Sequence, residues 1–323
     1  MQTFQQFIAE AKIKIKGNLC HEFGKFTPCE GKSEKPKSKK SKVIDDDSVK
    51  KSLDEITKNG KYNCDHNTHK FLLENKIDPK ELVKSVIGVD MSKDFKGKVY
   101  IEKEGDHKIK IVSFDLEHPT GAKIKQCTRT LDLKKGEVHH DLLELEQSSQ
   151  NSNVVKQMYK DALPMYKKLK MKKITLQANL TAGGYAWAKY GFKPSKGTDN
   201  EDGFDNDINI SNVHKNSASR LNTFTDYVSL SGKAKQEHDG ILKLIEKTKP
   251  DKIISVLANL KTPNLDKELN NHKDKISAFT GVKTFPPKFE MTASKFLLIN
   301  SNWFGELELK GKSKKHLEQY INQ

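Results

Sequence analysis

Residues 174–192 read ITLQANLTAGGYAWAKYGF, and this stretch decides the fold. It begins inside a run of alternating apolar and polar residues, Lys173–Ala178, which is typical of a β-strand. Residues 182–190 then have the spacing of a short helix. Gly191 follows them, and glycine is the residue that most often ends a helix in the left-handed conformation. The stretch therefore predicts a strand, a helix and a tight turn into another strand.

The residues before this stretch predict the rest of a sheet. The alternation of apolar and polar residues indicates strands at 98–102, 108–114, 123–133 and 138–145. A helix follows them, because apolar side chains recur at helical spacing at Val154, Val155, Met158, Ala162, Tyr166 and Leu169. Strands followed by helix, strand and helix predict an α/β (α+β) protein, with a mixed sheet flanked by helices.

The flanking ranges have a different composition. We expect a small helical segment at 46–84, with helices near 47–58 and 67–75, and an acidic loop at 196–219. The C-terminal region, 220–323, is predicted to be a helical appendage. Its expected helices are 235–247, 251–260, 265–279 and 312–321. A strand is expected to return to the sheet near 295–309, and residues 295–300 are its predicted first part.

The stretch 174–192 resembles the last third of the GNAT acetyltransferase fold. The pattern Gly-Gly-Tyr-x-Trp-Ala at 183–188, together with Trp-x-Gly-x-Leu-x-Leu at 303–309, is similar to GNAT-like domains of large phage virion proteins. The resemblance implies a GNAT-like domain at 85–195 that is completed by the C-terminal strand. Acetyl-CoA is the candidate cofactor that the resemblance suggests, although the sequence establishes no cofactor.

GNAT enzymes hold the acyl-CoA pyrophosphate on backbone N–H groups of a glycine-rich loop before a helix. The resemblance places this loop at 147–153, which contains no glycine. Asparagine tolerates a positive φ, so Asn151 and Asn153 could keep the loop shape, although their side chains would crowd the diphosphate. The implied cofactor contacts are Gln150, Asn151, Ser152, Asn153 and Asn179.

Four residues bear on a catalytic role. Trp187 stands where many GNAT enzymes have a tyrosine that protonates the leaving thiolate, and an indole N–H cannot serve as that acid. The nearby Tyr185 is a weak candidate acid, and His140 and Glu144 are weak candidate bases. For His140 and Glu144, the better interpretation is an ordinary polar side chain that faces solvent from a strand. The aromatic side chains of this stretch are better explained as part of a hydrophobic core. Whether the protein is an enzyme stays open.

The N-terminus reads MQTFQQFIAEA, in which Phe4, Phe7 and Ile8 would form one apolar stripe of a short helix. The general alternative is a chain end that docks on its own domain. The segment resembles the capsid-targeting peptide of internal head proteins of T4-like bacteriophages. In that family the peptide binds the prohead scaffold, and the prohead protease cleaves after an apolar-x-Glu tripeptide and before a small residue.

The tripeptide Ile8-Ala9-Glu10 before Ala11 matches this cleavage pattern. The resemblance implies that residues 1–10 are a propeptide and that the mature chain starts at Ala11. It further implies that the protein lies inside the phage head with packaged DNA and reaches the host cytoplasm with that DNA.

The chain is strongly basic, with 58 Lys+Arg against 43 Asp+Glu and a net charge of +15. Residues 11–45 are predicted to be a disordered basic linker, because 32–42 contain no apolar residue. Candidate contacts to DNA phosphates are Lys35, Lys37, Lys39, Lys40 and Lys42; the alternative is a solvated linker. No apolar run is long enough to span a membrane, so no membrane partner is expected.

Cysteines and histidines suggest a zinc hypothesis that their spacing does not support. Cys20, Cys29, Cys64, His66 and His69 follow no standard zinc-finger pattern. We therefore predict no metal site, and the sequence leaves open whether these residues bind one.

Three functions remain. The preferred one is an injected virion protein that uses a GNAT-like scaffold to bind a host protein, with an anti-phage defence nuclease or RNA polymerase as candidates. The second is an active acetyltransferase that modifies a host amine. The third is a head protein that associates with DNA without sequence preference.

Overall fold

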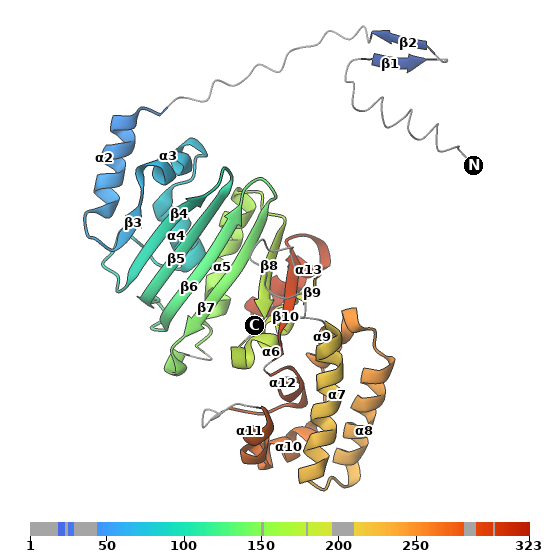
Figure 1. The fold of residues 1–323 in the computed structure, drawn as a ribbon. Coiled ribbons are helices and arrows are strands. Elements are labelled where there is room, and N and C mark those ends of the chain that lie inside the picture. Colours follow the sequence, from blue (N-terminus) through green and yellow to red (C-terminus); the bar gives the residue numbers. More distant parts are fainter. Residues whose placement is uncertain are drawn as a thin grey trace. The chain divides into compact units, whose positions relative to one another are not determined.

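The computed structural model describes two compact units, residues 1–43 and 44–323 (Figure 1). The residues described are 19–22, 25–28, 44–149, 152–178, 180–195, 210–280, 289–299 and 301–323. In the first unit, β1 (Leu19–Glu22) and β2 (Lys25–Pro28) pair antiparallel. This hairpin lies within the range 11–45 predicted as a basic linker, where the sequence analysis expected no strand. The targeting peptide and 32–42 lie outside the described residues.

The second unit is built on an eight-stranded sheet in the order β3-β4-β5-β6-β7-β8-β10-β9. The pairs β3/β4 and β7/β8 are parallel and the others antiparallel, so the predicted mixed sheet is confirmed. The strands are β3 (Tyr62–Cys64), β4 (Lys98–Glu104), β5 (Lys108–Glu117), β6 (Lys123–Asp132), β7 (Glu137–Leu145), β8 (Lys173–Ala178), β9 (Lys193–Pro194) and β10 (Trp303–Glu308).

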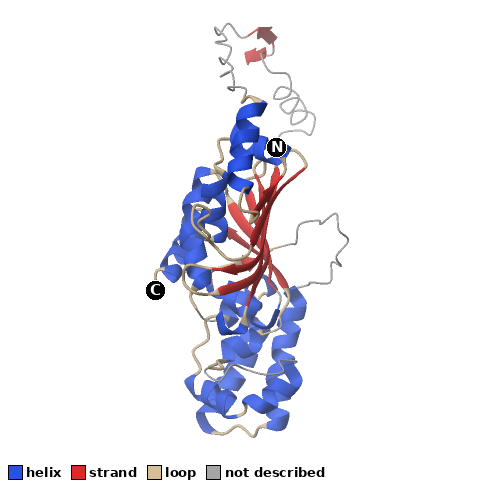
Figure 2. Ribbon diagram, turned by 90° about the vertical axis from the view of Figure 1, so that its left-hand side faces the viewer, coloured by secondary structure: helices blue, strands red, loops and turns tan. Residues whose placement is uncertain are grey.

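Helices α4 (Pro79–Ile87), α5 (Val154–Lys168) and α13 (Gly311–Ile321) cover one face of this sheet (Figure 2). The alternation along the strands explains this arrangement. Ile101 and Ile111 are buried on the covered face, whereas Phe114 points to the other face and is 38% exposed. Helix α4 was not predicted, although its start at Pro79 and its end at the left-handed Gly88 are standard helix signals.

The predicted small helical segment joins the same sheet. Helices α2 (Asp46–Thr57) and α3 (His66–Glu74) confirm the two expected helices. Asp45 caps α2, because its carboxylate accepts the N–H of Ser48. The strand β3 between the two helices pairs with β4 and extends the sheet at its edge.

The C-terminal region is helical, as expected, but three predictions there were wrong in detail. Helix α6 (Leu180–Lys189) lies before this region and confirms the helix predicted at 182–190. The helices that follow are α7 (Ile210–Tyr227), α8 (Gly232–Lys247), α9 (Pro250–Leu257), α10 (Pro263–Asn271), α11 (Lys273–Thr280) and α12 (Ala293–Leu298). Helix α7 begins inside the predicted acidic loop, whose acidic residues lie outside the described part of the chain. The single helix predicted at 265–279 is two helices that are separated at His272.

The third correction concerns the strand predicted to begin at residue 295. Residues Ala293–Leu298 form helix α12, which is capped by the Thr292 hydroxyl, and the returning strand is β10. Phe296, Leu297 and Leu298 are all buried in α12. A short apolar run that is buried on every side has no periodicity, so it does not distinguish a strand from a helix.

Candidate functional site

The two central parallel strands separate near the middle of the sheet, and this separation defines the candidate site. β7 and β8 pair from Glu137 opposite Lys173 to His140 opposite Leu176. Beyond that pair β7 continues to Leu145, whereas the end of β8 pairs only with β10. In open α/β sheets, ligands bind outside the carboxyl ends of parallel strands, which is where these two strands diverge.

A β-bulge in β7 separates the two candidate bases. Leu142 lies opposite Thr128 and His140 lies opposite Arg129, so Asp141 is the extra residue of the bulge. The bulge shifts the alternation of side chains along β7. His140 lies before the bulge on the helix-covered face, two residues after the buried Val138, and is only 6% exposed, whereas Glu144 lies after the bulge on the other face. Glu144 pairs with Lys125 at 2.9 Å instead, so the structure does not bring the two bases together.

His140 belongs to a buried polar cluster. Its Nε2 lies 3.1 Å from the Tyr166 hydroxyl and its Nδ1 lies 3.3 Å from the Tyr159 hydroxyl. Burial, followed by the nearby Arg129 charge, lowers the pKa of His140, so the imidazole is neutral near pH 7. Because a neutral imidazole has one donor and one acceptor nitrogen, one tyrosine donates to it and the other accepts. The residue acts as a hydrogen-bonded part of the core.

Arg129 is a functional candidate that the sequence analysis missed. It is 3% exposed, and its Nη1 donates to the backbone oxygens of Thr128 (2.8 Å) and Leu142 (2.9 Å). No ion pair to Arg129 occurs among the described residues. One sequence signal could have found it, because Arg129 and Arg220 are the only arginines in a chain with 58 Lys+Arg.

The loop before α5 adopts part of the expected conformation. Asn153 caps α5 with φ 58° and ψ 8°, which is the left-handed conformation, and its side chain makes no capping hydrogen bond. The Ser152 hydroxyl donates to the Ser149 carbonyl at 2.6 Å, so it is engaged within the loop. The other proposed cofactor contacts, Gln150, Asn151 and Asn179, lie outside the described residues.

The aromatic residues of α6 pack together. The half-buried Trp187 ring contacts Tyr159, Tyr190 and Phe192, with centroids 6.4, 5.8 and 5.7 Å away. Tyr185 is also half-buried, and burial raises its pKa to about 12. The Lys189 ammonium lies 5.9 Å from the Tyr185 ring centroid. Among the described contacts Tyr185 touches neither His140 nor Glu144, so the three catalytic candidates form no common site.

The described residues of the zinc hypothesis are engaged separately. The Cys64 thiol lies 3.5 Å from the Asp65 carbonyl, and burial raises its pKa to about 12, which disfavours the thiolate that binds zinc. His66 lies 3.5 Å from Asp46, and His69 lies 3.1 Å from the Ser52 hydroxyl. Within the described part of the chain, no group of three or more potential metal ligands gathers.

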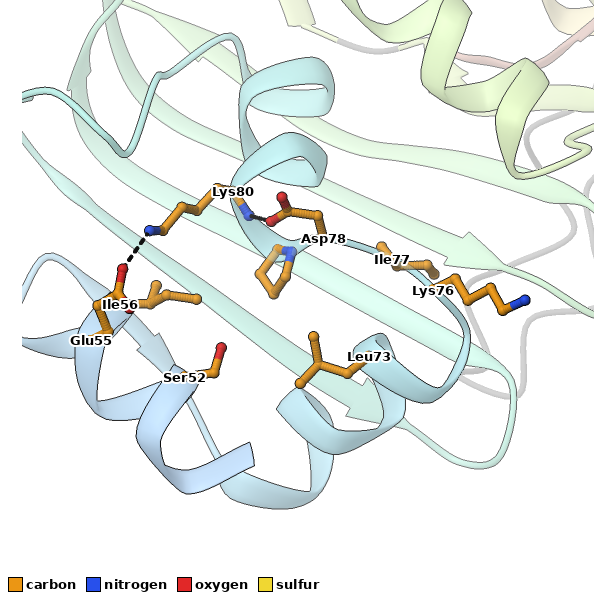
Figure 3. A pocket seen from close by; sticks show the side chains of 9 residues that line it. Ser52, Glu55, Ile56, Leu73, Lys76, Ile77, Asp78 and Lys80 are labelled. Atoms are coloured by element: carbon orange, nitrogen blue, oxygen red, sulfur yellow. Dashed lines mark hydrogen bonds and ion pairs between the residues drawn. The ribbon is translucent and has the colours of Figure 1, made fainter. Parts of the chain in front are cut away.

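A separate pocket lies between α2, α3 and α4, with a volume of about 430 Å³ (Figure 3). Its lining combines apolar side chains with the Ser52 hydroxyl and an ion pair of Lys80 and Glu55 at 3.2 Å. Asp78 also lines it and accepts the backbone N–H of Lys80 at 2.8 Å. Lys80 and Glu55 are thus paired with each other and Asp78 with a backbone N–H, and the mixed lining indicates no particular class of ligand.

Comparisons with protein-family models, with curated proteins and with solved structures find no match to this chain. A search for membrane spans finds no helix of sufficient length and apolar character in the described residues. The site at the separation of β7 and β8 is therefore interpreted from the chemistry of this chain.

Proposed function

We propose that this protein is an internal head protein of a bacteriophage, packaged with DNA, processed after Glu10 and delivered into the host cytoplasm. There it binds a host protein, with proteins of anti-phage defence as the leading candidates. The observation that carries this proposal is the tripeptide Ile8-Ala9-Glu10 before Ala11. The lysine-rich range that follows supports association with packaged DNA, since lysines neutralise phosphates without a fixed fold.

The geometry of the compact unit favours binding over catalysis. His140 is buried with both ring nitrogens hydrogen-bonded to tyrosine hydroxyls, Glu144 is paired with a lysine, and Tyr185 stands apart from both. An acyl transferase needs a proton acceptor within reach of the attacking amine. None of the three candidates meets that requirement in the described structure, so a GNAT-like scaffold would serve here as a binding surface.

Protein recovered from mature phage heads should begin at Ala11. The expected change is the loss of residues 1–10, which N-terminal sequencing and intact mass both detect. A Glu10→Ala variant should stay uncleaved, because the protease pattern requires glutamate before the cut. Gln6→Ala, which changes the same segment outside the tripeptide, should be processed normally. An intact Met1 terminus in mature heads would contradict the packaging proposal.

A second candidate function is acetyl transfer from acetyl-CoA to a host amine. Asn153 favours it, because this residue adopts the left-handed conformation that glycine supplies in GNAT loops. The loop leads into the N-terminus of α5, where the first backbone N–H groups of a helix attract phosphate. The separation of β7 and β8 beyond His140 leaves the adjoining strand segments unpaired with each other.

Calorimetry with acetyl-CoA tests this candidate on the full chain. Stoichiometric binding in the micromolar range is the result expected of an acyl-CoA site. Asn153→Gly should tighten that binding, because glycine keeps φ 58° and removes the side chain that crowds the diphosphate. Asn153→Val should weaken it, since a β-branched residue resists a positive φ. If millimolar acetyl-CoA produced no heat of binding, acetyl transfer would be contradicted and binding of a host protein would remain as the proposed function.

A further inference from the structure

A serine and a histidine are in hydrogen-bond contact at the wall of the pocket between α2, α3 and α4. Ser52 belongs to α2 and His69 to α3, and the Ser52 Oγ lies 3.1 Å from the His69 Nε2. A nucleophile and its general base need a distance of about 2.6–3.2 Å. Ser52 is half-buried and lines the pocket, and Figure 3 shows its hydroxyl pointing away from α2 toward the pocket.

The hydrogen bonding of His69 differs from that of His140, which uses both ring nitrogens. His69 has 0% of its surface exposed, and its Nδ1 has no hydrogen-bond partner among the described residues. Burial, followed by the nearby His66, lowers the pKa of His69, so its imidazole is neutral near pH 7. In the tautomer with a proton on Nδ1, Nε2 accepts the Ser52 hydroxyl and can take its proton.

Asp78 adds a negative charge to this pair. It is the N-cap of α4 and lines the same pocket, with one carboxylate oxygen accepting the backbone N–H of Lys80 at 2.8 Å. Its charge raises the pKa of His69 against the effect of burial, which favours the imidazolium that forms when His69 takes a proton. Serine, histidine and aspartate therefore come together from three helices, and such a set is recognised by its geometry and roles.

We propose that Ser52 and His69 are the nucleophile and the general base of an esterase site that takes small carboxylic esters. The mixed lining names no ligand, so the reaction class follows from the pair. The pocket of about 430 Å³ has the size of small-molecule sites, which is about 300–1,000 Å³. This activity is independent of the proposed function, because it uses neither the N-terminal segment nor the strands β7 and β8.

The reaction has two steps. The Ser52 Oγ bonds to the ester carbonyl carbon while its proton passes to His69 Nε2, and the C–O bond of the ester then breaks as the alcohol leaves with that proton. Water next gives a proton to Nε2 and attacks the acyl-serine, and Ser52 recovers the proton as the carboxylic acid leaves. Lys80 lines the pocket with an ammonium that has three N–H donors, one of which goes to Glu55 at 3.2 Å, and its charge favours the oxyanion.

Hydrolysis of p-nitrophenyl acetate by the full chain tests the proposal. Ser52→Ala and His69→Gln should each lower kcat by about one-hundredfold or more with little change in KM. Asp78→Asn should lower kcat by about tenfold, because asparagine still caps α4 but carries no charge. Ser48→Ala is the matched control, since Ser48 is an exposed serine of the same helix that donates to Asp45, and it should keep full activity.

A covalent probe keeps the test independent of any variant that does not fold. Diisopropyl fluorophosphate should leave one adduct on the wild-type chain, which peptide mass spectrometry should place on Ser52, and Ser48→Ala should keep that adduct. Circular dichroism checks the fold of His69→Gln. An adduct on another residue, or hydrolysis that Ser52→Ala leaves unchanged, would assign the reaction to a different group and overturn the proposal. Absence of both the adduct and hydrolysis would overturn it as well.

Discussion

Deleting residues 12–43 should strongly reduce both the affinity for DNA and the dependence of that affinity on salt. The range contains ten lysines and three acidic residues between 12 and 42. Each phosphate that a lysine neutralises contributes about −0.9 to the slope of log affinity against log salt. Loss of all ten contacts would therefore change the slope by up to about 9. Fluorescence anisotropy with a duplex of random sequence, at several salt concentrations, measures this slope.

A charge-matched pair of variants locates the effect. Changing Lys35, Lys37, Lys39, Lys40 and Lys42 to glutamine should lower the slope by about 4 to 5. The control removes the same net charge by changing five exposed lysines of the unit 44–323 to glutamine. These lysines are Lys215, Lys233, Lys243, Lys247 and Lys252. It should leave the slope nearly unchanged. The reverse pattern would move DNA contact to the compact unit and contradict the role of the basic range.

The same measurement bears on the third function, a head protein that only associates with DNA. That function predicts steep salt dependence, no sequence preference and no host partner. The preferred function predicts that the chain without residues 12–43 loses DNA binding but retains binding to its host protein. The two functions therefore differ in what remains after the deletion.

Mild acid should destabilise the compact unit, starting near pH 6.5. Burial is the largest cause that lowers the pKa of His69, His118, His139 and His140 below the ordinary value of 6.5. As the pH falls below that value, these histidines bind protons in the unfolded chain but stay neutral in the folded state. Stability is therefore present above pH 6.5 and is lost below it, by up to ~1.4 kcal/mol per pH unit for each such histidine. Urea denaturation between about pH 7.5 and 5 measures the loss.

A single substitution isolates the contribution of the buried cluster. His140→Gln retains hydrogen-bonding groups for Tyr159 and Tyr166 but does not titrate. The free energy of unfolding should therefore fall less steeply with decreasing pH, by the contribution of about one histidine. His107→Gln is the control, because His107 is exposed, and it should leave the slope unchanged. Carboxylates with lowered pKa values, such as Asp90 at about 2, lose their contribution only in stronger acid. A free energy of unfolding that stays constant down to about pH 5 would contradict the burial of neutral histidines.

Local patterns predicted the strands and helices that build the sheet. The alternation at Lys98–Glu104 and Lys108–Glu117 carried the strand assignments, because one face of each strand is buried and the other is not. The helix at Val154–Lys168 was predicted from apolar spacing for the same reason. The assignment failed at Ala293–Leu298, where every residue of a short helix except Lys295 is buried and the pattern loses its period.

The candidate site depended on features that no local pattern records. A bulge at Asp141 puts Glu144 on the face opposite to that of His140, where Glu144 pairs with Lys125. The asparagine at 153 was predicted to tolerate a positive φ, and the structure has it there at 58°.

The sequence by itself determined the strand and helix periods, the basic charge and the cleavage-like tripeptide at the N-terminus, because each of these is a property of neighbouring residues. Only the tertiary structure decided that Arg129 adjoins the separation of β7 and β8, and that the three catalytic candidates stay apart. The physical reason is that these relations depend on strand order, on the register between strands and on one bulge. All three are set by packing between segments that are distant in the chain.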